Sequence, residues 1–402
     1  MYCFYFYSNF AVKEDVVKVL VATDAEGWDT MVNRQLVAEL AKNPRVVLYC
    51  YVPNMTPKQR GQAESNIKLV TAPKGMVGFT KKQLIQWPPD SLVFDVFIIH
   101  SYGRDLGLQA QVVKKNTNCK WVHVVHTISE ELEKYVEVVS STDTADPDCL
   151  PEHELQVALC EKADLVIAIG PKVADAYESA LCHCGKDENV ITMTPGIIHD
   201  LVGVRTKRYD GKRFCVLIGA TYPSKYFKVK GCDIAAKAIT LLQEKSYHLF
   251  FAVRSNDSVE NLQHQLEGLI SLSQFTIKRV SKSIEDWRKL LCQVDLTIMP
   301  SAEGFGITGV RAISADVPVL SSGNNGFGMA LEKLPSGKMH VLDSENPQVW
   351  ANKISEIRDK SPAKQDREAK KLREEYMRKY CWREQCGDVV DKMMMLLRKK
   401  GM

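Results

Sequence analysis

The sequence predicts an α/β protein with two doubly wound domains, and three observations lead to that fold class. Strand-like and helix-like patterns alternate along the chain, which favours parallel sheets covered by helices. The chain has 402 residues, of which 45% are hydrophobic and 25% charged, so it is long enough for two sizeable cores. A glycine-rich turn near Gly304 follows a short apolar run and precedes an amphipathic segment, which is a phosphate-binding layout.

The first domain is expected to alternate strands with helices and to close at Pro195-Gly196. The expected strands are 16–23, 45–51, 94–100, 121–126, 164–168 and 190–194, and the expected helices are 31–40, 107–115 and 154–162. Residues 55–90 and the acidic loop 141–149 are expected to be irregular, because Pro, Gly and polar residues interrupt any periodic pattern there.

The second domain restarts the alternation at Phe214. Its expected strands are 214–219, 248–253, 275–279, 296–299 and 317–320, and its expected helices are 232–243, 259–269, 283–292 and 307–314. A long charged helix from Ala363 is expected to end the chain. Within it, the run 393–397 indicates an apolar face and the preceding Lys, Glu and Arg residues a solvated one.

The glycine-rich turn is the most informative segment. The apolar run 296–299 predicts a buried parallel strand, and residues 301–306 then lead into the amphipathic segment 307–314. Gly304 and Gly306 allow the backbone to approach an anion closely. The unpaired N–H groups and the positive dipole end of the following helix attract a diphosphate.

The same turn also satisfies a second pattern, since Gly304, Gly306 and Gly309 form the G-x-G-x-x-G of dinucleotide-binding folds. Such folds place an acidic residue at the end of the next strand to hold the ribose. Here the strand 317–320 leads into Ser321-Ser322-Gly323 instead. A dehydrogenase is therefore the third-ranked hypothesis for this chain.

The segment closely resembles the donor-site signature of GT-B glycosyltransferases of family 4, also called group 1. The residues 300–306, PSAEGFG, match the family pattern P-S-x-x-E-G-F-G nearly position by position, and 317–322, VPVLSS, match the element that follows it. The resemblance implies a GT-B fold, in which two Rossmann-like doubly wound domains face a cleft and a C-terminal helix crosses back to the first domain. It also implies a transferase that moves a glycosyl group of the hexosyl type from a nucleotide-diphosphate sugar to an acceptor, with retention.

The resemblance also sets the expected domain boundaries. The N-terminal domain, on the acceptor side, covers 1–205, the nucleotide-sugar-binding domain 206–375, and the crossover helix 376–402. The run Tyr380-Cys381-Trp382-Arg383 resembles the F-S-W-E that begins this helix in the family.

One position departs from the family. The family has two glutamates separated by seven residues; Glu303 supplies the first, but Arg311 occupies the second position. In the family the first glutamate touches the transferred sugar and the second binds the ribose hydroxyls. A carboxylate accepts hydrogen bonds from hydroxyls, whereas a guanidinium only donates and suits phosphate or carboxylate. The departure leaves two hypotheses open: an enzyme with an altered donor site, or a degenerate module that binds a nucleotide, glycan or protein partner without turnover.

Other site residues follow from the resemblance one at a time. Gly27 lies in the loop after the first strand, near donor and acceptor, although a loop glycine without ligand is an equal alternative. His126 ends the strand KWVHVVH, where the family histidine lies near the transferred sugar; the alternative is a packed strand-end histidine, as expected for His100 and His123. Lys230, before Gly231, matches the lysine that pairs with the diphosphate, and Lys225 is a substitute for its arginine companion.

The catalytic candidates and the donor-binding candidates converge on one expected cleft. The candidates are Glu303 and His126 for catalysis, and Gly27, Lys225, Lys230, Gly304, Phe305, Gly306 and Arg311 for donor binding.

No metal or cofactor is expected besides the donor substrate itself. The twelve cysteines occur singly except in Cys182-His183-Cys184, which lacks a second ligand pair at zinc spacing. Those in apolar runs, Cys50, Cys160, Cys215 and Cys292, are expected to be buried and reduced. Asp146-Pro147-Asp148 has the D-x-D form of metal-dependent transferases but lies in a Pro-containing loop, not directly after a buried strand.

The charge and hydropathy of the chain bound its partners. A formal charge of +4 is slight and indicates no nucleic-acid tail. The aromatic opening 1–7 lacks a basic region and does not have the form of a secretion signal, and no stretch approaches the roughly 20 apolar residues of a membrane span. A cytoplasmic protein is expected, whose partners are a nucleotide sugar and an unknown acceptor, with peripheral membrane contact left open.

Overall fold

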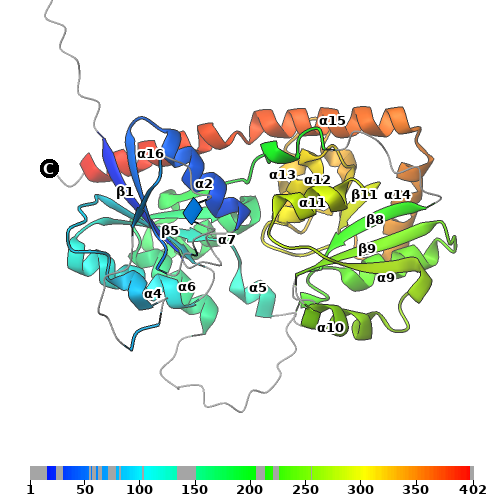
Figure 1. Ribbon diagram of the computed structural model, residues 1–402, viewed down its shortest axis with the longest axis horizontal. Coiled ribbons are helices and arrows are strands. Elements are labelled where there is room, and N and C mark those ends of the chain that lie inside the picture. The colour runs from blue at the N-terminus through cyan, green and yellow to red at the C-terminus, as the bar shows by residue number, and fades with distance from the viewer. Residues whose placement is uncertain are drawn as a thin grey trace, which may run out of the picture.

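The computed structural model shows two α/β lobes joined by a pair of C-terminal helices (Figure 1). The described residues are 16–23, 30–53, 56, 60–61, 66–70, 78–80, 83–101, 104–133, 151–204, 213–220, 226–254 and 256–398. Gly27, Lys225, the loop 141–149 with its Asp146-Pro147-Asp148, and the opening 1–7 lie outside these residues, as does much of 55–90.

The first domain is a seven-stranded parallel sheet in the order β3-β2-β1-β4-β5-β6-β7. Its strands are β1 (Val17–Ala22), β2 (Val46–Tyr51), β3 (Lys68–Val70), β4 (Val96–Ser101), β5 (Lys120–Val125), β6 (Leu165–Ile169) and β7 (Val190–Met193). Its helices are α2 (Met31–Lys42), α4 (Arg104–Thr117), α5 (Ser129–Glu133), α6 (Glu152–Lys162) and α7 (Pro171–Leu181). The central strands are apolar almost throughout because helices cover both faces of the sheet.

The second domain is a six-stranded parallel sheet in the order β10-β9-β8-β11-β12-β13. Its strands are β8 (Phe214–Gly219), β9 (Tyr247–Val253), β10 (Phe275–Arg279), β11 (Leu296–Met299), β12 (Val319–Ser322) and β13 (Val341–Leu342). Its helices are α9 (Cys232–Leu241), α10 (Asn256–Leu266), α11 (Ile284–Leu291), α12 (Ile307–Ser314), α13 (Gly326–Glu332) and α14 (Pro347–Asp359). Both sheets reverse strand order beside their first strand, so the predicted doubly wound fold class is confirmed.

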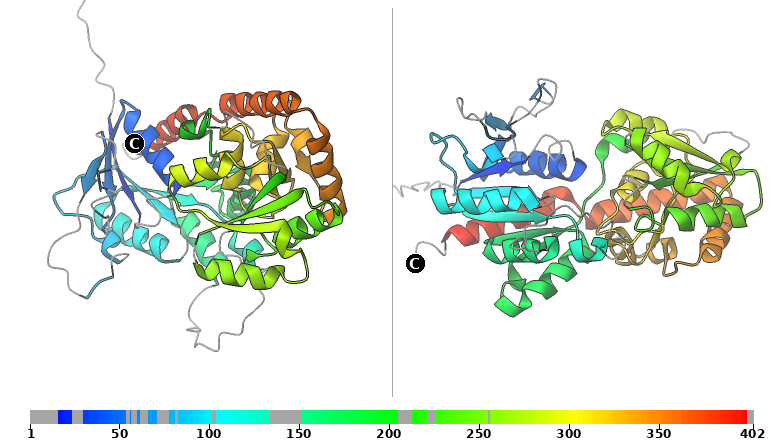
Figure 2. Two further views of the ribbon diagram at one scale, coloured as in Figure 1. Left: turned by 45° about the vertical axis from the view of Figure 1, so that its right-hand side comes forward. Right: turned by 90° about the horizontal axis from the view of Figure 1, so that it is seen from below.

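The C-terminal helices connect the two domains. α15 (Pro362–Lys379) lies along the second domain, whereas α16 (Trp382–Arg398) lies along the first, as the view from below shows (Figure 2). The Tyr376 hydroxyl donates to the Pro195 carbonyl at 2.8 Å. Gln385 accepts from the Thr194 N–H at 2.7 Å and donates to its carbonyl at 3.0 Å. The linker at Pro195-Gly196 is therefore held by both C-terminal helices, and no added Cβ fits at Gly196 beside the Tyr380 carbonyl.

Several elements differ from the sequence-based expectation. The expected single helix from Ala363 is two helices, with the break at 380–381. Helices α5, α7, α13 and α14 and strands β3 and β13 were not predicted. Two of these helices, α7 and α14, begin with a proline at the first turn, a start signal that their sequences carry. Cys50, Cys160 and Cys215 are buried thiols as expected, but Cys292 is exposed because it caps the end of α11 at the surface.

Candidate active site

A cleft of about 350 Å³ lies between the two domains, where the strands of both sheets end. The lining residues of the first domain are Thr30, Met31, Val32, His126, Thr127 and Ile169. The second domain supplies residues from the carboxyl ends of β9, β10 and β11 and from α11 and α12. Doubly wound folds bind ligands at this edge, next to the point where the strand order reverses. The structure therefore brings His126, Lys230, Glu303 and Arg311 to one cleft.

Hydrogen bonds from the start of α13 hold the glycine-rich turn in place. Asn325, which is completely buried, donates through its side-chain amide to the carbonyls of Met299 (3.3 Å) and Ser301 (3.2 Å). Its carbonyl oxygen accepts from the Gly328 N–H, which caps α13. The Phe327 N–H donates to the Phe305 carbonyl at 2.7 Å. These bonds preorganise the turn before α12, so its exposed N–H groups are available to a ligand.

Two left-handed glycines shape the same wall. Gly306 caps α12 at φ 94° and Gly231 caps α9 at φ 67°, a region that favours glycine. A Cβ on Gly231 would also collide with the Pro300 carbonyl. The Ala302 N–H donates to the Val229 carbonyl at 2.9 Å, which ties the turn before α9 to the turn after β11.

Lys230 and Glu303 form an ion pair between these two turns. Their side chains are 17% and 25% exposed, so both reach the cleft while partly shielded from water. The pairing was not expected, since the resemblance assigns the lysine to the diphosphate and the glutamate to the sugar. The two groups therefore offset each other's charge.

His126 directly follows β5 on the opposite wall, and its ring contacts the ring of a second histidine. His126 Nε2 lies 3.3 Å from Nδ1 of the buried His100, and His123 Nε2 lies 3.5 Å from the Gln156 carbonyl oxygen. Burial, followed by the nearby His100 and His123, holds the pKa of His126 well below its usual range. Burial likewise lowers the pKa of His100 to about 3 and that of His123 to about 4. His126 therefore faces the cleft as a neutral ring.

Arg311 lies one turn into α12 and stacks on an aromatic ring. Its guanidinium carbon lies 4.1 Å from the centre of the Trp287 ring of α11. Burial and the charge of Arg254, at the end of β9, lower the pKa of Arg311 to about 9. The group is still charged at neutral pH. Among the described residues the ion-pair partner of Glu303 is Lys230 and not Arg311.

Lys172 is a functional candidate that the sequence-based reasoning missed. It lies on α7 of the first domain, nearly buried, and donates to the carbonyls of Ala302 (3.1 Å) and Asn324 (3.0 Å) in the second domain. Its ammonium also pairs with Glu131 of α5 at 2.6 Å. Lys172 thus fixes the residue before Glu303 relative to the first domain. The sequence carries a start signal for this helix, the proline at its first position after Gly170, but no helix was predicted there.

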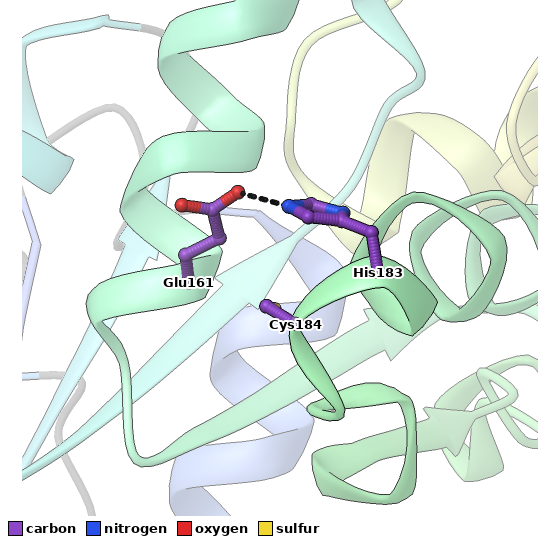
Figure 3. Close-up of side chains that lie close together, drawn as sticks. All are labelled: Glu161, His183 and Cys184. Carbon is purple, nitrogen blue, oxygen red and sulfur yellow. Dashed lines mark ion pairs between the residues drawn. The ribbon is translucent and has the colours of Figure 1, made fainter.

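The Cys-His-Cys run of the sequence acquires a third donor in the fold. His183 and Cys184 lie beside Glu161 from the end of α6 (Figure 3), with donor atoms of the three residues within 4.8 Å of one another. His183 Nε2 lies 3.1 Å from the Glu161 carboxylate, and Nδ1 lies 2.7 Å from the Ala180 carbonyl. The site is exposed and offers three donors, whereas structural zinc sites take four. The geometry describes a surface ion pair that joins α6 to the end of α7.

Solved structures share this two-domain architecture. Sucrose-phosphate synthase from Thermosynechococcus elongatus superposes with a TM-score of 0.70 at 15% identity, over 95% of this chain and 100% of that chain. The Anabaena protein HepE, whose crystal structure holds UDP and glucose, gives a TM-score of 0.66 at 16% identity, over 94% and 100% of the two chains. The shared fold and the cleft define this chain as a GT-B protein.

The family follows from the sequence match. A model described as "Family 4 Glycosyltransferase in conflict systems" matches residues 22–389. The chain belongs to this glycosyltransferase family. A curated relative, D-inositol 3-phosphate glycosyltransferase from Corynebacterium urealyticum, is 23% identical over 300 residues, which cover 71% of this chain and 68% of that protein. Among the described helices, none combines the length and apolarity needed to cross a membrane.

Proposed function

We propose that this protein transfers a glycosyl group from a nucleotide-diphosphate sugar to an acceptor, with retention at the anomeric carbon. The observation that supports the proposal best is the Lys230–Glu303 pair, set beside the first turn of α12 in the cleft between the domains. A cation and unpaired backbone N–H groups suit a diphosphate, and the adjacent carboxylate suits sugar hydroxyls.

The reaction breaks the bond between the anomeric carbon and the β-phosphate oxygen and forms a bond from that carbon to the acceptor oxygen on the same face. The acceptor proton passes to the departing phosphate oxygen. Lys230 and the N–H groups after Gly306 offset the charge that grows on the diphosphate, while Glu303 orients the sugar. His126 contributes a neutral ring on the sugar side of the cleft. No protein nucleophile is required.

The relatives suggest which ligands to test first. HepE holds UDP and glucose in its crystal structure, so UDP-sugars lead the donor panel. The Corynebacterium relative is named for an inositol phosphate, which makes phosphorylated polyols the first acceptors to test. We also infer a cytoplasmic location, because all cysteines of the described residues are free thiols, as a reducing compartment favours.

One observation supports a second candidate function. Arg311 lines the cleft at the position where the resemblance expects a ribose-binding glutamate, and a guanidinium cannot accept a hydrogen bond from a ribose hydroxyl. A module that binds a nucleotide, glycan or partner without turnover fits that change as well. The two candidates share the cleft and differ only in bond breakage.

Calorimetry and a donor-hydrolysis assay on the full chain separate the two. UDP, GDP, ADP and their sugars are titrated first, and release of nucleoside diphosphate is then followed over time. The transferase predicts binding followed by release. Binding without release by wild type supports the module. Absence of binding to every nucleotide contradicts the transferase and leaves only a module that binds a glycan or a partner.

A further inference from the structure

The second-domain wall of the cleft carries more positive charge than a nucleoside diphosphate alone explains. Its lining includes the cations Lys230, Arg254, Lys282 and Arg311, and the carboxylate of Glu303. Glu303 is already paired with Lys230. Within the described residues, no ion pair joins a carboxylate to Arg254 or Arg311. Cations in excess of carboxylates in a cleft favour an anionic ligand.

The guanidinium of Arg311 is held in a fixed place. Its stacking on Trp287 at 4.1 Å orients the plane of the group and leaves its N–H edge for hydrogen bonds. Arg254 is close enough for its charge to disfavour the charged form of Arg311. Two like charges in a partly dehydrated cleft repel each other, and an anion between them removes that repulsion. The pair is therefore arranged as a receptor for an anion rather than as a structural ion pair.

The position along α12 indicates which part of a ligand meets this pair. Gly306 caps the helix beside Lys230 and Glu303, and Arg311 lies five residues or about 7.5 Å further along the axis, at a rise of about 1.5 Å per residue. A diphosphate at the first turn of α12 therefore places the attached ribose near Arg311 and the transferred sugar near Glu303. In doubly wound folds an acidic residue meets a free ribose hydroxyl, whereas an arginine meets a ribose phosphate.

We propose that the cleft selects a nucleotide whose ribose carries a second anionic group, a 2′- or 3′-phosphate, bound by Arg311 and Arg254. The inference rests on the proposed function in placing the diphosphate at α12, and it specifies the class of donor. The guanidinium of Arg311 contacts two phosphate oxygens at once, while Arg254 offsets the remaining charge. An unmodified ribose offers the two cations only neutral hydroxyl oxygens, which do not offset their charge.

Calorimetry with matched nucleotides tests the proposal. UDP, GDP and ADP are each compared with the same nucleotide bearing a 2′- or 3′-phosphate, and ADP-ribose is compared with 2′-phospho-ADP-ribose. We expect at least one ribose-phosphorylated ligand to bind tenfold or more tightly than its parent. The corresponding 5′-triphosphates add charge at a different place, and we expect them to gain less than threefold.

Two variants assign the gain to the arginines. Arg311→Gln is expected to reduce the preference for the ribose phosphate to less than threefold, and Arg254→Gln, at an exposed position, to reduce it in part. Arg367→Gln, on the exposed face of α15, is the matched control and is expected to leave the preference unchanged. Arg254→Gln also keeps the test decisive if Arg311→Gln does not fold.

The outcomes distinguish this inference from the proposed function. Equal affinity within every matched pair, or an equal gain for the 5′-triphosphates, overturns the ribose-phosphate site and leaves the transferase proposal standing. A preference that survives both arginine variants overturns the assignment to Arg311 and Arg254. If no nucleotide of either kind binds, both proposals fall.

Discussion

The two walls of the cleft differ in charge and in the way their residues are held. The described second-domain lining includes four cations and one carboxylate, and Asn325 and Phe327 hold its glycine-rich turn in place. The described lining of the first domain has no charged side chain, and its His126 rests on the neutral His100. From this difference we expect the anionic part of a ligand to bind the second domain and the uncharged part to bind the first.

The largest effect is expected at Glu303, the one carboxylate in the described lining of the second-domain wall. Glu303→Gln is expected to lower the rate of donor turnover by about 100-fold or more, as loss of a preorganised electrostatic group does. Affinity for the nucleoside diphosphate is expected to hold or to tighten, since Lys230 no longer has an anionic partner. Steady-state kinetics and calorimetry on the same preparation measure both quantities. A parallel loss of affinity and turnover would remove Glu303 from a role on the sugar side.

Lys230→Ala is expected to weaken diphosphate binding by roughly 1–3 kcal/mol, the range for a hydrogen bond to a charged partner. Nucleoside binding is expected to change little, because the nucleoside has no phosphate for the lysine to contact. Lys228→Ala, at an exposed position of the same turn, is the matched control. Equal losses for UDP and uridine, or for whichever base binds, would exclude a phosphate role and remove the contrast between the walls.

The neutral histidines of the first domain predict that the free energy of unfolding depends on pH. The folded-state pKa values of His100 and His123, about 3 and about 4, lie below the unfolded value of about 6.5. Below 6.5 the unfolded chain binds protons that the folded chain excludes, so stability is full above 6.5 and falls as pH drops toward the folded values. The loss is expected to be roughly 1 kcal/mol per histidine at one pH unit below 6.5.

Denaturant unfolding at pH 7.5 and 5.5 measures this loss, and His123→Gln is expected to reduce it. Constant stability across that interval would show that these histidines titrate in the folded chain as they do in the unfolded chain, contrary to the neutral first-domain wall described above.

The smallest effect is expected at the contact between the walls. Lys172→Met removes the hydrogen bonds to Ala302 and Asn324 and is expected to lower the free energy of unfolding by roughly 1 kcal/mol. The apparent KM for donor is expected to rise more than kcat falls, because the variant loosens the position of the turn before Glu303. Lys115→Met, exposed on α4, is the control. A variant with unchanged KM and stability would show that the domains are held together without Lys172.

The sequence predicted the alternation of strands and helices because buried parallel strands are continuous apolar runs, as in β8 and β11. It did not predict α13, whose short run contains Gly326 and Gly328 and is stabilised by the Asn325 cap and by the turn above it. That helix depends on tertiary contacts, which local propensity does not report.

The sequence could group the turn 300–306 with the helix after it because these residues are neighbours along the chain, and the structure places them in one cleft. Lys172 was not, because its partners are up to 152 residues away and no local pattern links them. Arg254 follows β9 at the carboxyl edge of the sheet, so the rule for ligand sites in such sheets could have indicated it. The Lys230–Glu303 pair required the fold, since two turns had to be brought together.

We propose that the protein cleaves a nucleotide-diphosphate sugar, in the cleft between the two walls, at the bond from the anomeric carbon to the diphosphate. Incubating wild type and Glu303→Gln with the donor panel and quantifying released nucleoside diphosphate by mass spectrometry tests that claim most directly. We predict release by wild type with at least one donor, at a rate about 100-fold or more above that of the variant. Equal release by the two proteins, or binding of donor by wild type with no release, would contradict it.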